Sequence, residues 1–148
     1  MILCSCTQGG SAPEINAAVD SNAEVRLGDM NVGCHITYVN EGMASMTISS
    51  PDTLSGLRFS RADGKNSMSL GSLLCRSEKS MPGSSSLPQQ VFSALDTVRS
   101  SDMKLLEEKD GEYTFSGVGS GTDITVVTDS TGKPLRLENE QLRIVFSQ

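Results

Sequence analysis

The sequence contains no tryptophan, a single histidine, four phenylalanines and two tyrosines among its 148 residues. With so few aromatic side chains, the core has to be built from aliphatic residues and from the seven methionines. Methionine adapts its shape to irregular spaces, so this composition suits a solid core and an apolar pocket equally well. The lone His35 and the lack of a G-x-S-x-G elbow give a Ser-His-Asp hydrolase no support, so we expect no enzyme activity.

The sequence is also poor in positive charge and in long apolar runs. Lys and Arg number 12 against 18 Asp and Glu, which gives a net charge of −6, and the basic residues form no cluster. Such a chain repels polyanions, so nucleic acid is excluded as a partner, as is binding to anionic lipid by charge alone. No apolar run reaches the roughly 18 residues of a membrane-spanning helix. One histidine and distant cysteines match no zinc-binding spacing, so neither a metal nor another cofactor is expected.

From Ala23 onward, apolar residues recur at every second position, which indicates half-buried β-strands. In one clear example Val32, Cys34 and Ile36 share a face, and His35 lies on the outward side. Asn-Glu-Gly and Asp-Gly sequences between these runs are typical of turns. The pattern predicts about eight or nine strands, arranged as a meander in which neighbours along the chain pair in the sheet.

One helix is predicted after the fifth strand, from Ser86 to about Ser100. Ser86 and Gln89 have the spacing of a capping box. Apolar residues then form one helical stripe, while Asp96 faces away from it. The stripe consists of Leu87, Val91, Leu95 and Val98. The predicted fold is mainly β (α+β): a strongly curved antiparallel sheet, or incomplete β-barrel, with one amphipathic helix packed on its concave face.

The N-terminal sequence Leu3-Cys4-Ser5-Cys6 resembles the lipobox of bacterial lipoproteins. This resemblance implies that Cys6 is lipidated, and it places the protein outside the cytoplasm, anchored to the cell membrane through its N-terminus. The apolar segment that precedes a lipobox would then be encoded upstream of Met1. Residues 1–22 would be a lipobox remnant and a flexible tether, and residues 23–148 a single half-barrel domain. The alternative is a chance Cys-x-Cys sequence.

The tail from Thr122 to Phe146 carries a second recognisable pattern. A strand (TDITVVTD) leads into the turn Asp129-Ser-Thr-Gly-Lys-Pro134, and two short strands ending in IVF follow. This is similar to the closing hairpins of the LolA/LolB-like and LppX/LprG-like lipoprotein folds, in which D-x-x-G-x-P links the late strands. The resemblance implies an incomplete antiparallel barrel around a hydrophobic cavity that accepts acyl chains. It assigns no ligand-binding residue position by position.

Inward-facing apolar residues are the candidate lining of such a cavity. The predicted set is Ile36, Met46, Ile48, Phe59, Phe92, Leu95, Phe115, Val126 and Ile144. The same residues would equally pack on one another as a solid core. Cys34 and Cys75 both lie in predicted strands at inward positions, where they would either pair as a disulfide across the sheet or remain two buried thiols.

These observations support two functional hypotheses of different classes. The first is a membrane-anchored extracytoplasmic lipoprotein that binds a lipid or another hydrophobic ligand in a half-barrel cavity. The second is a non-catalytic interaction module that binds another envelope protein through a sheet edge or face, because an incomplete barrel leaves strand edges unpaired.

Overall fold

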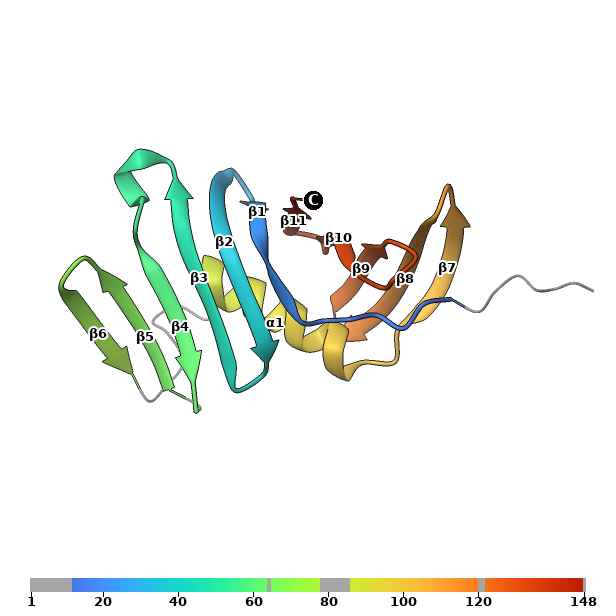
Figure 1. Ribbon diagram of the computed structural model, residues 1–148, viewed down its shortest axis with the longest axis horizontal. Helices are drawn as coiled ribbons and strands as arrows, with labels where there is room; N and C mark the ends of the chain where they lie inside the picture. The colour runs from blue at the N-terminus through green and yellow to red at the C-terminus, as the bar shows by residue number, and fades with distance from the viewer. Residues whose placement is uncertain (1–11, 64, 78–85, 120–121, 148) are drawn as a thin grey trace, which may run out of the picture.

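The computed structural model describes residues 12–63, 65–77, 86–119 and 122–147, which form one long sheet and one α-helix (Figure 1). In chain order the elements are β1 (Val19–Leu27), β2 (Met30–Asn40), β3 (Met43–Ser50), a 3-10 turn (Asp52–Leu54), β4 (Arg58–Ala62), β5 (Lys65–Leu70), β6 (Leu73–Ser77), α1 (Leu87–Ser100), β7 (Lys104–Lys109), β8 (Glu112–Gly119), β9 (Thr122–Thr128), β10 (Pro134–Glu138) and β11 (Leu142–Phe146).

The strands follow one another across the sheet in the order β6-β5-β4-β3-β2-β1-β11-β10-β9-β8-β7. Every neighbouring pair is antiparallel. All pairs are hairpin neighbours in the chain except β1 and β11, which join the two halves of the sheet at its centre. The predicted meander is therefore confirmed, and β6 and β7 are the edge strands.

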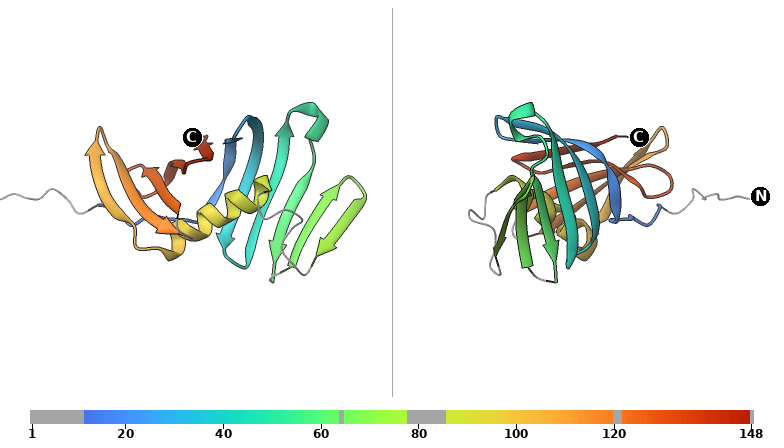
Figure 2. Two further views of the ribbon diagram at one scale, coloured as in Figure 1. Left: turned by 180° about the vertical axis from the view of Figure 1, so that it is seen from behind. Right: turned by 60° about the vertical axis from the view of Figure 1, so that its left-hand side comes forward.

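The sheet curls into an open half-barrel, and α1 crosses its concave side (Figures 1 and 2). The helix packs mainly on β2, β8, β9 and β11, around the central seam. Burial alternates along the central strands, because one face of each strand meets the helix and the other meets solvent. The predicted fold class, a curved antiparallel sheet with one helix inside it, is confirmed.

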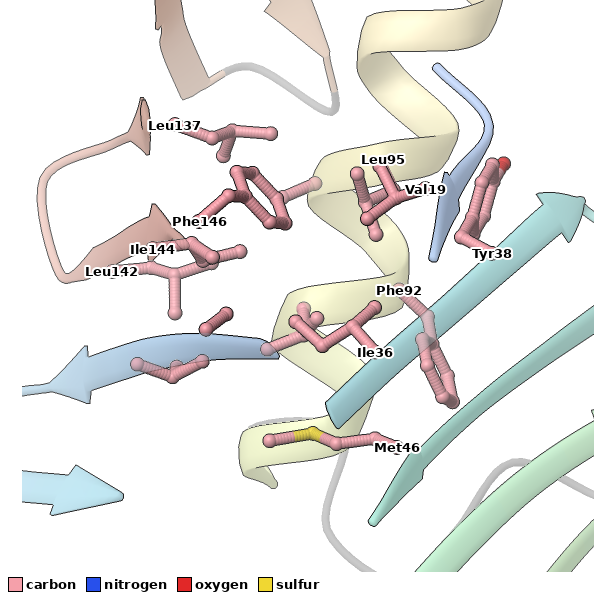
Figure 3. Packing of buried hydrophobic residues seen from close by; sticks show 14 of the residues in the cluster. Val19, Ile36, Tyr38, Met46, Phe92, Leu95, Leu137, Leu142, Ile144 and Phe146 are labelled. Carbon is pink, nitrogen blue, oxygen red and sulfur yellow. The ribbon is translucent and has the colours of Figure 1, made fainter. Parts of the chain in front are cut away.

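The hydrophobic core lies between α1 and the middle of the sheet. Side chains from β2 and β3 meet Phe92 and Leu95 of the helix, and the C-terminal strands close the other side (Figure 3). The fully buried hydrophobic side chains are Val25, Ile36, Tyr38, Met46, Val91, Leu95, Val126, Leu137, Leu142 and Ile144. The predicted helical stripe of Leu87, Val91, Leu95 and Val98 is buried here throughout.

The strand count differs from the prediction, since eleven strands are described rather than eight or nine. The main omission is the β5–β6 hairpin, which the sequence pattern merged into one strand running toward Cys75. Gly71 adopts a left-handed backbone with φ of +59°, and this conformation allows a two-residue turn between Leu70 and Leu73. The helix consequently follows the sixth strand and not the fifth.

The helix itself starts and ends where the sequence predicts, but the capping box is not formed. Ser86 is the N-cap residue and makes no side-chain hydrogen bond to the helix. Its Oγ is buried without a hydrogen-bond partner. Pro88 occupies the first turn, where its missing N–H donor leaves no helical bond unmade.

The first strand begins four residues before residue 23, where the sequence predicts the start of the domain. β1 starts at Val19, and Ala17 is already buried against the core. The backbone N–H of Asn16 donates to the carbonyl oxygen of Gly132 at 2.9 Å, which fixes the incoming chain on the β9–β10 turn. Residues 1–11, which include Cys6, lie outside the described residues, so the tether and lipidation remain predictions.

We expect Gly132→Ala to destabilise the fold and to release the segment before β1. Gly132 has φ of +87°, and a Cβ there would overlap the carbonyl oxygen of Glu14. A left-handed backbone combined with a backbone clash should lower the free energy of unfolding by about 2 kcal/mol or more. Urea denaturation measures the loss, and limited proteolysis reports cleavage within residues 12–18.

Gly28→Ala is the matched control, because Gly28 also has a positive φ, +60°, but its Cβ would meet no atom within 4 Å. It should cost only about 1 kcal/mol. Equal losses for both variants would show that the contact with Glu14 contributes nothing to stability.

Candidate functional site

The predicted cavity residues are brought together, and most of them are buried. Eight of the nine are buried in the core cluster, and Phe59 alone is only partly buried. The eight are Ile36, Met46, Ile48, Phe92, Leu95, Phe115, Val126 and Ile144. Figure 3 shows five of them, Ile36, Met46, Phe92, Leu95 and Ile144, packed between the helix and the sheet. Around the seam, the described side chains form a solid core.

Surface hollows lined by described residues lie elsewhere. One of about 570 Å³ sits beside the β10–β11 turn and is lined by Arg26, Glu138, Asn139 and Arg143, among others. Another, of about 480 Å³, lies over the ends of β9 to β11. None of the nine predicted lining residues contributes to either hollow.

An apolar inner face continues beyond the helix on the part of the sheet formed by β4, β5 and β6, which we call the β4–β6 wing. Phe59 lies opposite the fully buried Met46 in the β3–β4 register, and Met68 lies opposite Phe59 on the next strand. Cross-strand partners share a face of a sheet. The row of Met46, Phe59 and Met68 therefore extends the hydrophobic core onto the wing. Phe59 and Met68 are half-buried, in contrast to Met46.

A second row runs beside the first on the same inner face of the wing. Leu57 is half-buried, and Leu70 and Leu73 face each other across the β5–β6 hairpin and are exposed. Figure 1 shows this wing extending past the N-terminal end of α1. The described chain therefore presents a partly open apolar surface on the wing, next to the filled core.

A polar cluster ties the helix to the sheet at the border between core and wing. Asp96 of α1 accepts hydrogen bonds from the Tyr38 hydroxyl at 2.7 Å and from Arg61 Nη1 at 2.9 Å. Arg61 also donates to the Glu41 carbonyl oxygen at 3.2 Å, and its guanidinium lies 5.2 Å from the Phe92 ring centre. Burial, reinforced by the Asp96 carboxylate, raises the pKa of Tyr38, so the hydroxyl stays protonated.

The helical pattern predicts that Asp96 faces away from the core, and that prediction is wrong. Asp96 is partly buried, because it reaches past the apolar stripe to Tyr38 and Arg61. One feature of the sequence indicated that a buried side chain would need a polar partner such as Asp96. Tyr38 continues the strand period of Cys34 and Ile36 and so shares their inward face, where a buried tyrosine hydroxyl needs a hydrogen-bond acceptor.

His35 lies on the outward face of β2, as predicted. Its Nε2 is 2.6 Å from Asp20 Oδ1, and its Nδ1 is 2.9 Å from Asn22 Oδ1. The hydrogen bond to His35 lowers the pKa of Asp20, and Thr37 adds to the effect. Both ring nitrogens are thus hydrogen-bonded within a surface cluster on β1 and β2.

Of the two alternatives left open for Cys34 and Cys75, the structure excludes the disulfide. Cys34 on β2 is a buried free thiol, and burial raises its pKa to about 12. Cys75 belongs to the edge strand β6, and β3, β4 and β5 lie between the two. Strands about 4.8 Å apart place them roughly 19 Å from each other, whereas a disulfide needs Cα atoms within about 7 Å.

Within the ranges that the structure covers, no three His, Cys, Asp or Glu side chains gather in a way that would hold a metal ion. Among the same residues, no helix has the length and hydropathy needed to cross a membrane.

Comparison with solved structures identifies the fold. An uncharacterized conserved protein from Thermus thermophilus matches with a TM-score of 0.54 at 10% identity, covering 86% of this chain and 74% of that one. A LolA superfamily protein from Nitrosomonas europaea matches with a TM-score of 0.50 at 11% identity, covering 87% and 83%. A putative outer membrane lipoprotein-sorting protein domain from Vibrio parahaemolyticus gives 0.42 at 16% identity, covering 82% and 63%.

No protein-family model matches the chain, and no curated protein matches it either. The likeness to known proteins is therefore one of fold and not of sequence. The predicted resemblance to a LolA-like fold is confirmed at the level of architecture.

Proposed function

Starting from a LolA-like fold, we propose that this protein is a membrane-anchored extracytoplasmic lipoprotein that holds a lipid or another acyl-chain ligand in its half-barrel, without catalysing a reaction. The observation that carries the proposal is the row of Met46, Phe59 and Met68, which continues the core onto the open wing. Apolar side chains that remain half-exposed on a concave face gain free energy when an acyl chain covers them, about 0.8 kcal/mol for each buried CH₂.

The wing suits the ligand better than the space beneath the helix does. Ile36, Leu95 and Ile144 are fully buried there, so a guest would first have to displace the helix and open a packed interior. On the wing, Leu57, Phe59 and Met68 are already partly accessible. We therefore shift the proposed site from the centre of the half-barrel to the inner face of β4 and β5, and of the predicted lining only Phe59 belongs to it.

The anchor is the second part of the proposal, and it depends on the lipobox-like sequence ending at Cys6. The first described residues enter the fold on the β7 side of the sheet, away from the β4–β6 wing (Figure 1). A chain anchored through Cys6 would therefore keep its inner apolar face free to receive a ligand.

Native mass spectrometry tests both parts, on protein made in a bacterial host from a gene that retains the segment encoded upstream of Met1. We expect a co-purifying lipid on the parent protein, a loss of at least about fivefold in the lipid-bound fraction for Met68→Gln, and an acyl mass on Cys6 under denaturing conditions. Met68→Gln keeps the side-chain length but puts an amide on the apolar row.

The matched control is Leu106→Gln on β7, an exposed leucine at the opposite end of the sheet. It should keep the lipid of the parent, and urea denaturation should show both variants folded. Absence of bound lipid from the parent, or an equal loss in both variants, would defeat the ligand proposal. An unmodified Cys6 in membrane-extracted protein would defeat the anchor.

An envelope interaction module is the second candidate function. It is favoured by β7, an edge strand whose residues are all exposed and which carries Leu105 and Leu106 beside acidic residues. An uncovered edge is a site at which another protein can add a strand.

A further inference from the structure

Four exposed leucines gather at one end of the β4–β6 wing. Leu70, Leu73 and Leu74 flank the β5–β6 turn, and Leu54 lies in the 3-10 turn that leads into β4. The two turns adjoin, because a Cβ built at Gly56, just after the 3-10 turn, would come within 3.8 Å of the Leu70 side chain. We call Leu54, Leu70, Leu73 and Leu74 the leucine tip.

The leucine tip contributes little to the core, since Leu73 is 70% exposed and Leu74 is 52% exposed. Natural edge strands usually carry charged residues or proline to prevent unwanted contacts. A pair of exposed leucines at a hairpin end therefore indicates a surface that another apolar phase or molecule covers.

The faces of the hairpin on which the leucine side chains lie indicate what kind of partner could cover them. Successive strand residues point to opposite faces, so Leu73 lies on the concave face and Leu74 on the convex face of the hairpin. A groove on another protein would cover one face of the strand. A medium that surrounds the whole turn, such as the interfacial region of a bilayer, covers both faces at once.

The charged residues near the leucine tip indicate which lipid headgroups it would contact. In the sequence, residues 51–77 carry four Lys or Arg and two Asp, although the whole chain has a net charge of −6. One of the four, Arg61, is already paired with Asp96. Arg58 is exposed and lies in the same cross-strand row as Leu74, through Ser69. A cation close to an inserting apolar turn is attracted by the negative surface of an anionic leaflet.

The opposite end of the sheet provides an internal comparison. Leu105 and Leu106 on β7 are about as exposed as the leucine tip, with Leu106 at 64%. Residues 102–112 around them carry five acidic and only two basic residues. An anionic membrane would repel the β7 end of the sheet. Its leucines are as exposed as those of the leucine tip, but they would not bind the same membrane.

We propose that the leucine tip inserts into the interface of an anionic lipid bilayer, with Arg58 facing the headgroups. This membrane contact goes beyond the proposed carrier function, because it requires neither a bound ligand nor an acylated cysteine. Together with an N-terminal acyl anchor it would supply a second attachment point, and two weak attachments hold far more firmly than one. It would also hold the open inner face of the wing at the lipid surface.

The absence of tryptophan from the chain gives a direct test of insertion. Leu73→Trp in the full chain, with Cys6→Ser to prevent acylation, introduces a single indole at the tip. Its fluorescence should shift to shorter wavelength on vesicles made from equal parts of phosphatidylcholine and phosphatidylglycerol. Leu106→Trp in the same background is the matched control and should show no shift.

Co-sedimentation with the same vesicles measures the affinity. Replacing Leu73 and Leu74 together by serine should lower the partition coefficient at least about tenfold, because most of the inserted apolar area is lost. The matched pair, Leu105→Ser with Leu106→Ser, should leave it unchanged. Raising the salt concentration, or using pure phosphatidylcholine vesicles, should weaken binding of the parent chain.

Three results would overturn the proposal: no blue shift for Leu73→Trp on anionic vesicles, equal shifts for the two tryptophan variants, or equal partitioning of the two serine pairs. Self-association that disappears with the Leu73 and Leu74 serine pair, without vesicle binding, would reassign the tip to a protein contact. None of these readouts depends on a ligand in the half-barrel, so this proposal and the carrier function fail independently.

Discussion

Leu95→Ala is expected to lower the free energy of unfolding by about 3 kcal/mol or more, the largest effect we foresee for a single truncation. Leu95 is fully buried at the middle of α1, where side chains from both halves of the sheet meet it. Removing its terminal carbons forfeits their burial and leaves a cavity that the surrounding strands can only partly close. Urea denaturation followed by far-ultraviolet circular dichroism measures the loss.

Leu74→Ala serves as the control, because it makes the same chemical change at an exposed strand position. It should alter stability by no more than about 0.5 kcal/mol. A loss below about 1 kcal/mol for Leu95→Ala would show that the helix does not close a packed core, and the ligand site would then return to the space beneath it.

Asp96→Ala is expected to have the second largest effect, a loss of about 2 to 3 kcal/mol. The variant leaves the fully buried Tyr38 without its 2.7 Å acceptor, and Arg61 without its carboxylate partner. An unpaired buried hydroxyl and a half-buried unpaired guanidinium both carry a desolvation penalty. The side chains of Arg61 and Asp96 are 13% and 26% exposed, so solvent moderates the charge contribution.

A double-mutant cycle identifies the source of the Asp96 effect. Tyr38→Phe removes the orphaned hydroxyl, so it should cost much less in the Asp96→Ala background than in the parent chain. Glu138→Ala, which breaks the exposed Arg136–Glu138 pair with side chains 39% and 42% exposed, should cost under about 1 kcal/mol. Additive losses for Tyr38→Phe and Asp96→Ala would contradict a shared network.

Alternation of apolar residues was sufficient to predict the curved sheet and its inner face. Ile36, Met46 and Ile144 were correctly assigned to the inside, because the strand period fixes the face on which each residue lies. The stripe from Leu87 to Val98 likewise identified the helix and its buried side. Local periodicity is strong information wherever an element buries only one of its faces.

The nature of the site could not be predicted in the same way. Periodicity shows which residues face inward, but whether they touch one another depends on how far the sheet curls around the helix. Cys34 and Cys75 both followed the strand period, yet their distance depends on the number of strands between them. Asp96 was misplaced because its partners, Tyr38 and Arg61, come from strands far away in the sequence.

The pairing of β1 with β11 has a consequence for how the chain folds. It joins residue 23 to residue 146, whereas every other strand pairs with its neighbour along the chain. The two meanders can form locally and early, but contacts between the ends of a chain are slow to form, because closing so long a loop costs entropy first. The half-barrel is therefore completed only after the last strand has been synthesised, so a nascent chain would still lack its central seam while it is being made.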